Sequence, residues 1–152
     1  MAGLNHNFLV IENGSFSMDK YEQYSKWNSV QIHDDLIGYF SDSLSWILSY
    51  NPCTEEELIG LCWYGSTIIE GGNVIKFSKI ISAWLQMISE APDLVTLKGN
   101  WGYAEGESPE SGSYEMLSFS KKDLVDKLSK LLSFCVTIKE SDGSQCLLHL
   151  GI

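Results

Sequence analysis

Two stretches of the chain repeat apolar residues at the spacing of a helix. The clearer stretch keeps this spacing over three turns from Phe77 to Ile88, and Ala91-Pro92 ends it. The other runs from Leu124 to Leu132 and follows Ser120 and Asp123, two residues that favour the start of a helix. In both stretches the apolar residues gather on one side. We therefore predict two amphipathic helices, each with one face in the core.

Two further helices have weaker signals. Residues 34–50 contain an apolar stripe, begin with acidic residues at the positive end of the helix dipole, and stop at Asn51-Pro52. The stripe consists of Leu36, Phe40, Leu44 and Ile47. Thr54 and Glu57 then form a capping-box pattern, which predicts a short helix that ends near Cys62.

The remaining apolar segments are short, lie between turn residues and predict β-strands. Their ranges are 6–11, 63–70, 94–103 and 114–119, with a further strand and a loop within 15–30. Near the C-terminus, residues 134–139 and 145–150 flank Asp142-Gly143, a pair typical of a tight hairpin turn. Strands that follow one another in this way favour antiparallel pairing.

The fold class that follows from these elements is α+β. We predict a mostly antiparallel sheet of roughly six or seven strands, with about four helices packed on it. The 152 residues suffice for one domain with a sizeable core, and neither an internal repeat nor a linker divides them. We therefore expect a single globular domain over residues 1–152.

The charge of the chain narrows the range of its partners. Twenty acidic residues against ten basic ones give a formal net charge of −10, and all ten basic residues are lysines. Nucleic-acid and phosphate binding usually depends on the guanidinium group of arginine, which the chain lacks. A field of this sign repels nucleic acid and anionic membranes and attracts a basic protein. In the alternative interpretation, the acidic residues only keep the protein soluble and indicate no particular partner.

The cysteines and histidines form no recognisable site. They are Cys53, Cys62, Cys135 and Cys146, and His6, His33 and His149. No CxxC pair occurs, and no histidine has a second ligand at zinc spacing, so we expect no metal and no cofactor. The first ten residues lack the basic region and cleavage site of a signal peptide, and no apolar run reaches the roughly 18 residues of a membrane helix. We expect a cytoplasmic protein with reduced thiols.

No motif indicates a catalytic site. The chain has no nucleophile elbow, no Walker loop and no dinucleotide-binding glycine pattern. His149 lies in a predicted strand, where we expect it to be half buried. A cysteine–histidine pair could form in space from Cys146 and His149 or from more distant residues, and the sequence selects none of these pairs. A small cytosolic hydrolase or transferase with an unrecognised Cys/His or carboxylate site therefore stays open as an alternative function.

An acidic and aromatic segment is the strongest candidate for a binding site. Four glutamates lie within eleven residues that contain no base, three aromatic residues flank them, and the Gly/Ser/Pro-rich stretch 105–113 is expected to be an exposed loop between two strands. The candidate residues are Trp101, Tyr103, Glu105, Glu107, Glu110, Tyr114 and Glu115. Carboxylates steer a basic partner and pair with it, and aromatic side chains supply contact area. In the alternative interpretation, the loop is only solvated and its aromatic residues point into the core.

The overall character of the chain resembles that of bacterial immunity proteins from polymorphic toxin and contact-dependent growth-inhibition systems. The segments behind the resemblance are the ISAWLQMIS helix from Ile81, the acidic GYAEGESPESGSYEMLSF hairpin, and the SKKDLVDKLSKLL helix that leads to the DGS turn. The resemblance covers most of the chain and lies in this overall character, not in one family motif. It implies a protein that binds and neutralises one cognate toxin domain, often a nuclease, and does no chemistry itself.

The implied mechanism agrees with the charge. A nuclease has a basic cleft that holds phosphates, and an acidic partner without arginine can cover that cleft. The resemblance implies a cognate toxin C-terminal domain as the partner, bound by the acidic and aromatic segment. Glu55, Glu56 and Glu57 would form a secondary patch. A scaffold or chaperone-like module for a different basic protein is a third interpretation.

Overall fold

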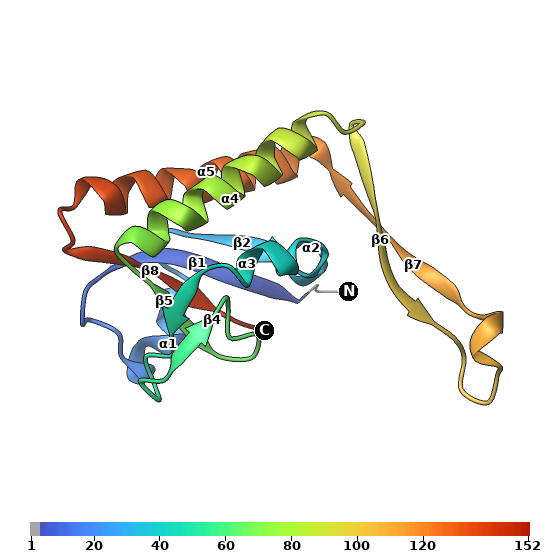
Figure 1. The fold of residues 1–152 in the computed structure, drawn as a ribbon, viewed down its shortest axis with the longest axis horizontal. Helices are drawn as coiled ribbons and strands as arrows, with labels where there is room; N and C mark the ends of the chain where they lie inside the picture. The colour runs from blue at the N-terminus through green and yellow to red at the C-terminus, as the bar shows by residue number, and fades with distance from the viewer. Residues whose placement is uncertain (1–3) are drawn as a thin grey trace.

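The computed structural model describes residues 4–152, and its centre is a six-stranded sheet (Figure 1). The strands lie in the order β2-β1-β8-β5-β3-β4. Their bounds are Asn5–Glu12 for β1, Ser29–His33 for β2, Leu48–Tyr50 for β3, Glu57–Ile59 for β4, Ser66–Ile69 for β5 and Gln145–Leu150 for β8. Each strand runs antiparallel to its neighbours, and helices pack on the sheet. The predicted α+β class is confirmed.

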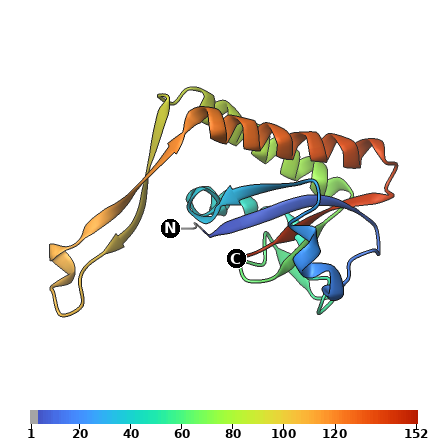
Figure 2. The ribbon, with the colours of Figure 1, turned by 180° about the vertical axis from the view of Figure 1, so that it is seen from behind.

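Two long helices cover one face of the sheet. They are α4 (Gly72–Ser89) and α5 (Lys121–Glu140), which lie side by side (Figures 1 and 2). Their buried side chains, among them Phe77 and Leu128, join Phe8 of the sheet in one apolar core. Both helices agree with the prediction from apolar spacing, because each buries the stripe that the pattern indicated.

The opposite face of the sheet has a second, smaller core. A 3-10 turn, η1 (Met18–Lys20), and the short helix α1 (Tyr21–Tyr24) lie beside it, and the hydroxyl of the buried Tyr24 accepts a hydrogen bond from the Ser17 amide at 2.9 Å. Tyr24 packs there with Leu9, Ile11, Ile68, Cys146, Leu148 and Leu150. The central strands are therefore covered on both faces, which explains why their sequences contain consecutive apolar residues and no apolar–polar alternation.

A long hairpin joins the two helices and projects away from the rest of the molecule (Figures 1 and 2). It consists of β6 (Leu94–Gly102) and β7 (Ser113–Ser120), which pair antiparallel, with a 3-10 turn, η2 (Pro109–Ser111), near the tip. We call residues 94–120 the arm. At its base, Val95 and Leu97 are buried in the main core. Both predicted strands are confirmed.

The predicted helix over residues 34–50 is wrong in its extent. The segment forms two short helices, α2 (Asp34–Tyr39) and α3 (Ser41–Leu44), and then strand β3. Serine side chains compete with helix formation here, since Ser43 Oγ donates to the carbonyl of Phe40 at 2.7 Å. Such local bonds favour turns over a continuous helix.

The short helix predicted from Thr54 is also wrong, because a turn and strand β4 occupy this segment. The Glu56 amide donates to Thr54 Oγ1 at 3.4 Å, and Glu55 has a φ of 60°. A right-handed helix requires a negative φ, so Glu55 excludes one. Pairing of β4 with β3 outweighs the local capping pattern.

The hairpin predicted around Asp142-Gly143 is a helix end followed by a strand. Helix α5 continues through the expected first strand, because Phe134, Cys135 and Ile138 extend its buried stripe at helical spacing. Asp142 and Gly143 have φ values of 53° and 81°, the left-handed conformation that commonly ends a helix. Strand β8 then pairs with β1 and β5.

The other strand predictions hold in part. The first strand is confirmed as β1, and the strand expected over 63–70 is shortened to β5. The segment 15–30 contains the start of β2 but also η1 and α1, which the pattern did not indicate. Within residues 4–152, no helix combines the length and the apolarity that crossing a bilayer requires.

Candidate functional site

The outer part of the arm is not covered by the rest of the chain. Every residue from 101 to 111 is exposed, which confirms the predicted exposed loop. The exposed fractions are 45% for Trp101, 54% for Tyr103, 47% for Tyr114 and 63% for Met116. A two-stranded hairpin alone is marginally stable in water, and large exposed apolar patches commonly mark binding surfaces. The alternative interpretation, in which the aromatic residues of this segment point into the core, is wrong.

A β-bulge decides which side of the arm its aromatic residues occupy. Lys98 lies opposite Met116. Trp101 lies opposite Tyr114, so β6 has two residues between these pairs where β7 has only Glu115. Residues directly opposite one another share a face of a hairpin, as do residues two apart on one strand. One face therefore carries Lys98, Trp101, Tyr114 and Met116, which we call the outer face.

Two glycines allow the close approach of the strands in the arm. A Cβ on Gly99, within the bulge, would lie 3.1 Å from Cβ of Glu115. A Cβ on Gly112 would overlap the carbonyl group of Gly102 across the hairpin. Because that neighbour is backbone, it has little freedom to move aside. The outer part of the arm therefore depends on these glycines for its shape.

The aromatic residues of the outer face are held in place. Trp101 Nε1 donates to the Pro109 carbonyl at 2.9 Å, which ties the ring to the turn at the tip. The centroids of the Trp101 and Tyr114 rings are 4.9 Å apart in an edge-to-face arrangement. Lys98 Nζ lies 4.3 Å from the centroid of the Tyr114 ring, within cation–π distance.

The tip of the arm is organised by serine and glutamate side chains. Ser108 Oγ accepts from the Glu110 amide at 3.4 Å and donates to the Glu110 carboxylate. The hydrogen bond that the carboxyl accepts from Ser108, and then one from the Glu110 backbone amide, lower the pKa of the Glu110 carboxyl. Ser111 Oγ lies 2.6 Å from the Ser108 carbonyl and 3.4 Å from Glu107 Oε2. The tip therefore presents its carboxylates on a turn that is held by these hydrogen bonds.

The four glutamates of the arm have no ion-pair partner among the residues that the structure describes. The ion pairs within residues 4–152 involve Asp34, Asp35, Asp93, Asp123 and Asp126, and none includes an arm glutamate. The only basic side chain between positions 94 and 120 is Lys98, which lies over a ring. The structure thus brings Trp101 and Tyr114 close to the glutamates at the tip of the arm, as the sequence predicted. The negative charge of these glutamates is available to another molecule.

Two exposed residues of the arm were missed by the sequence analysis. Met116 lies beside Tyr114 on the outer face, and Leu94 lies on the same side at the base. The signal was present, because Met116 alternates with Tyr114 along a predicted strand and therefore shares its face.

The second predicted patch lies apart from the arm. Glu55 and Glu56 occupy the turn before β4, and Glu57 begins β4, at one edge of the six-stranded sheet. The arm instead starts where α4 and α5 meet it, on the other side of the molecule (Figure 1). The structure does not join the two patches into one surface.

A buried chain of polar side chains crosses the centre of the sheet. His6 of β1 and His149 of β8 are both fully buried, and His6 Nδ1 lies 2.7 Å from His149 Nε2. His6 Nε2 bonds to Asp34 Oδ1 at 2.8 Å, at the start of α2. His149 Nδ1 bonds to Thr67 Oγ1 at 3.2 Å. The expectation that His149 is half buried is wrong, because β8 lies in the middle of the sheet.

This chain of hydrogen bonds is complete when both histidines are neutral. The carboxylate of Asp34 accepts from His6, His6 accepts from His149, and His149 accepts from the Thr67 hydroxyl. Thr67 Oγ1 in turn accepts from the Cys62 amide at 2.8 Å. Burial lowers the pKa of His6 despite the opposing effect of Asp34. Burial, and then repulsion by His6, lower the pKa of His149 well below its ordinary value.

The cysteine–histidine pair considered from the sequence is not assembled. Cys146 and His149 lie three residues apart on β8, so their side chains point to opposite faces of the sheet. Burial raises the pKa of the Cys146 thiol to about 12, and that of Cys135 likewise to about 12. Neither thiol is ionised to a useful extent near neutral pH, as a nucleophile would need to be.

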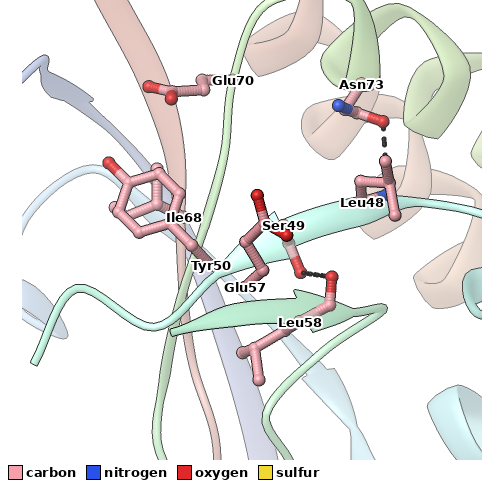
Figure 3. A pocket seen from close by; sticks show the side chains of 8 residues that line it. All are labelled: Leu48, Ser49, Tyr50, Glu57, Leu58, Ile68, Glu70 and Asn73. Atoms are coloured by element: carbon pink, nitrogen blue, oxygen red, sulfur yellow. Dashed lines mark hydrogen bonds between the residues drawn. The ribbon is translucent and has the colours of Figure 1, made fainter. Parts of the chain in front are cut away.

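A hollow between β3, β4, β5 and the start of α4 contains two carboxylates (Figure 3). Its volume is about 250 Å³, and it is lined by Leu48, Ser49, Tyr50, Glu57, Leu58, Ile68, Glu70 and Asn73. Asn73 Oδ1 accepts from the Leu48 amide at 3.2 Å, and Ser49 Oγ donates to the Gly60 carbonyl at 2.5 Å. The side chains of Asn73 and Ser49 therefore use these polar atoms to hold β3 in place.

Tyr50 and Glu70 are the remaining polar groups on one side of this hollow (Figure 3). Burial, and then the negative charge of Glu70, raise the pKa of the Tyr50 hydroxyl. Within the described part of the chain, no histidine, cysteine or lysine lines the hollow. Its ionisable side chains besides Tyr50 are the carboxylates of Glu57 and Glu70, which could face either a cation or a substrate.

Among residues 4–152, no group of three or more histidine, cysteine, aspartate or glutamate side chains is placed to hold a metal ion. Comparison with protein-family models, with curated proteins and with solved structures gave no match to this chain. The features of the molecule that bear on its function are therefore the arm and the net charge.

Proposed function

We propose that this protein is an immunity-type inhibitor that binds a basic toxin domain, such as a tRNase or DNase, and neutralises it without chemistry of its own. The observation that supports this most is the arm, which extends exposed aromatic side chains and unpaired glutamates away from the body. The resemblance of the sequence to immunity proteins points in the same direction. The net charge of −10 adds long-range attraction for a basic partner.

The arm suits the task of covering a phosphate-binding cleft. Such a cleft is concave and rich in lysine and arginine. A projecting hairpin enters a concave surface, its glutamates meet the basic side chains, and Trp101 and Tyr114 supply buried contact area. Electrostatic steering speeds encounter, which benefits an inhibitor that must intercept an incoming toxin.

The test uses the domain that an immunity protein would face. Immunity genes lie directly after their toxin genes, so the C-terminal domain encoded upstream is the partner to purify. We expect a one-to-one complex whose association slows as salt rises, and we expect co-expression to protect cells from that domain. The triple variant Glu105→Lys, Glu107→Lys and Glu110→Lys is expected to slow association by roughly tenfold or more at low salt.

The matched control reverses the same amount of charge elsewhere. Glu55→Lys, Glu56→Lys and Glu57→Lys change the net charge equally but leave the arm intact. We expect this second triple variant to affect association less. If the two triple variants act alike, or if only the second one acts, the assignment of the arm as the binding site is wrong. Absence of both binding and protection would overturn the immunity role itself.

A small hydrolase is the second candidate, because Glu57 and Glu70 line one hollow. Paired carboxylates serve as acid and base in glycoside hydrolysis. A screen of glycoside and ester substrates tests this function. Hydrolysis that Glu70→Gln abolishes while the melting temperature stays unchanged would favour the hydrolase over the inhibitor.

A further inference from the structure

The outer face of the arm already holds one cation. The ammonium of Lys98 lies 4.3 Å from the centroid of the Tyr114 ring, which is about half exposed. Trp101 stands edge-on beside Tyr114 and is fixed to the tip by its bond to the Pro109 carbonyl. Rings fixed in this way bind a cation without first losing side-chain freedom.

We propose that the outer face of the arm binds arginine or lysine side chains of a basic protein partner by stacking them on Tyr114 and Trp101, and that Lys98 occupies the Tyr114 ring until the partner displaces it. This inference rests on the proposed function and deepens it, since it names the side chains that the arm recognises. Arginine fits better than lysine, because the flat guanidinium stacks on a ring and is less strongly hydrated.

The bulge in β6 makes this face possible. It places Trp101 on the same side as Lys98, although three positions separate them and a regular strand would put them on opposite sides. The acidic tip lies directly beyond Trp101 along the hairpin. A cation stacked on the rings therefore lies in the same region as the carboxylates of the tip. Both the aromatic rings and the carboxylates favour a partner with positively charged side chains.

A second copy of the chain fits this face poorly. It would bring four more arm glutamates to a molecule of net charge −10, and it has no arginine to stack on the rings. A protein whose exposed surface is rich in arginine fits both the rings and the glutamates. We therefore infer a hetero-partner and not self-association.

The experiment measures binding of a fluorescent octa-arginine peptide to the intact chain by anisotropy, at low and at high salt. Tyr114→Leu is expected to weaken binding by about two- to fivefold, the usual range for an exposed cation–π contact. Lys98→Met keeps the apolar stem but removes the competing ammonium, so it is expected to strengthen binding by a similar factor. The matched control is Tyr64→Leu, which removes a ring that is 80% exposed outside the arm and is expected to change nothing.

The opposite results would overturn the proposal. Weaker binding on Lys98→Met would show that this lysine only supports the hairpin, and equal effects of Tyr114→Leu and Tyr64→Leu would show that the rings do not bind the cation. Self-association that the arm variants abolish, measured by light scattering, would assign the face to a second copy. Because the peptide is independent of any toxin, a failure of the immunity role leaves this test intact, and the reverse also holds.

Discussion

Mild acid is expected to destabilise this protein through its buried histidine pair. His6 and His149 are fully buried, 2.7 Å apart, and neutral in the folded state. Their folded pKa values lie below the ordinary value of 6.5, which the unfolded chain regains. Below pH 6.5 the unfolded chain therefore binds more protons than the folded one. The stability from these residues is complete above pH 6.5 and is lost as the pH falls.

The size of the effect follows from linkage. A histidine that cannot be protonated in the folded state costs about 1.4 kcal/mol of unfolding free energy between pH 7.5 and pH 5.5. His149 is expected to contribute this amount, and His6 adds up to the same again. One added proton leaves the Thr67 hydroxyl without its acceptor, and two would point N–H groups at each other across 2.7 Å. Typical domains have about 5–15 kcal/mol of stability, so the loss is measurable.

The assay is urea denaturation followed by tryptophan fluorescence at pH 7.5, 6.5 and 5.5. His149→Gln removes one buried titrating group, so its loss of stability between pH 7.5 and 5.5 is expected to be about 1.4 kcal/mol smaller than in the wild type. His33→Gln is the matched variant, because it makes the same substitution at a histidine outside the buried pair, with a side chain that is 31% exposed.

A second measurement does not depend on whether the variant folds. Proton NMR of the wild type follows the Cε1–H signals of all three histidines over the same pH range. We expect the signals of the two buried histidines, His6 and His149, to keep their shifts until the protein unfolds. Stability that is flat from pH 7.5 to 5.5, or a His149→Gln variant that keeps the full slope, would show that the buried histidine pair does not make the protein sensitive to acid.

Two further predictions concern the thiols and the end of helix α5. Iodoacetamide at pH 7.5 is expected to alkylate the exposed Cys53 in the native protein and to spare Cys135 and Cys146, because a pKa of about 12 leaves only about one thiol in 30,000 ionised. Mass spectrometry of the peptides measures which cysteines are labelled. Rapid labelling of Cys146 in the native protein would support a cysteine hydrolase instead. Gly143→Ala is expected to lower the unfolding free energy by about 1 kcal/mol, since Gly143 has a φ of 81°, which alanine adopts only with strain. Gly72→Ala in α4 is expected to be neutral or stabilising. Equal effects of the two substitutions in urea denaturation would show that the positive φ of Gly143 does not matter for stability.

Much of the fold could be predicted from the sequence where local pattern and tertiary environment agree. The helices α4 and α5 bury the stripes that the spacing indicated, and the arm forms from the strands that the alternation and turn residues indicated. The exposed acidic tip followed from composition alone, because a run of glutamate, glycine and serine has no means of entering a core. The candidate binding residues of the arm were found for this reason.

The failures share one cause, which is that a long-range partner outweighed a local signal. Thr54 and Glu57 form a pattern typical of a helix start, but this segment instead forms β4, which pairs with β3. The segment around Phe134 has strand-like composition, but packing against the sheet extends the helix through it. A local pattern records only the preference of a segment by itself, and packing free energies exceed such preferences.

The amino-acid sequence alone accounts for the charge of the molecule, its α+β class, its two main helices and the acidic arm. These features depend on composition and on the spacing of apolar residues within one segment. The tertiary structure brings His6 to His149, which is 143 residues away, and places β8 at the centre of the sheet. It also decided that a one-residue bulge turns Trp101 to the side of Tyr114. Register and strand order are set by which surfaces are buried together, and a single segment of chain does not contain that information.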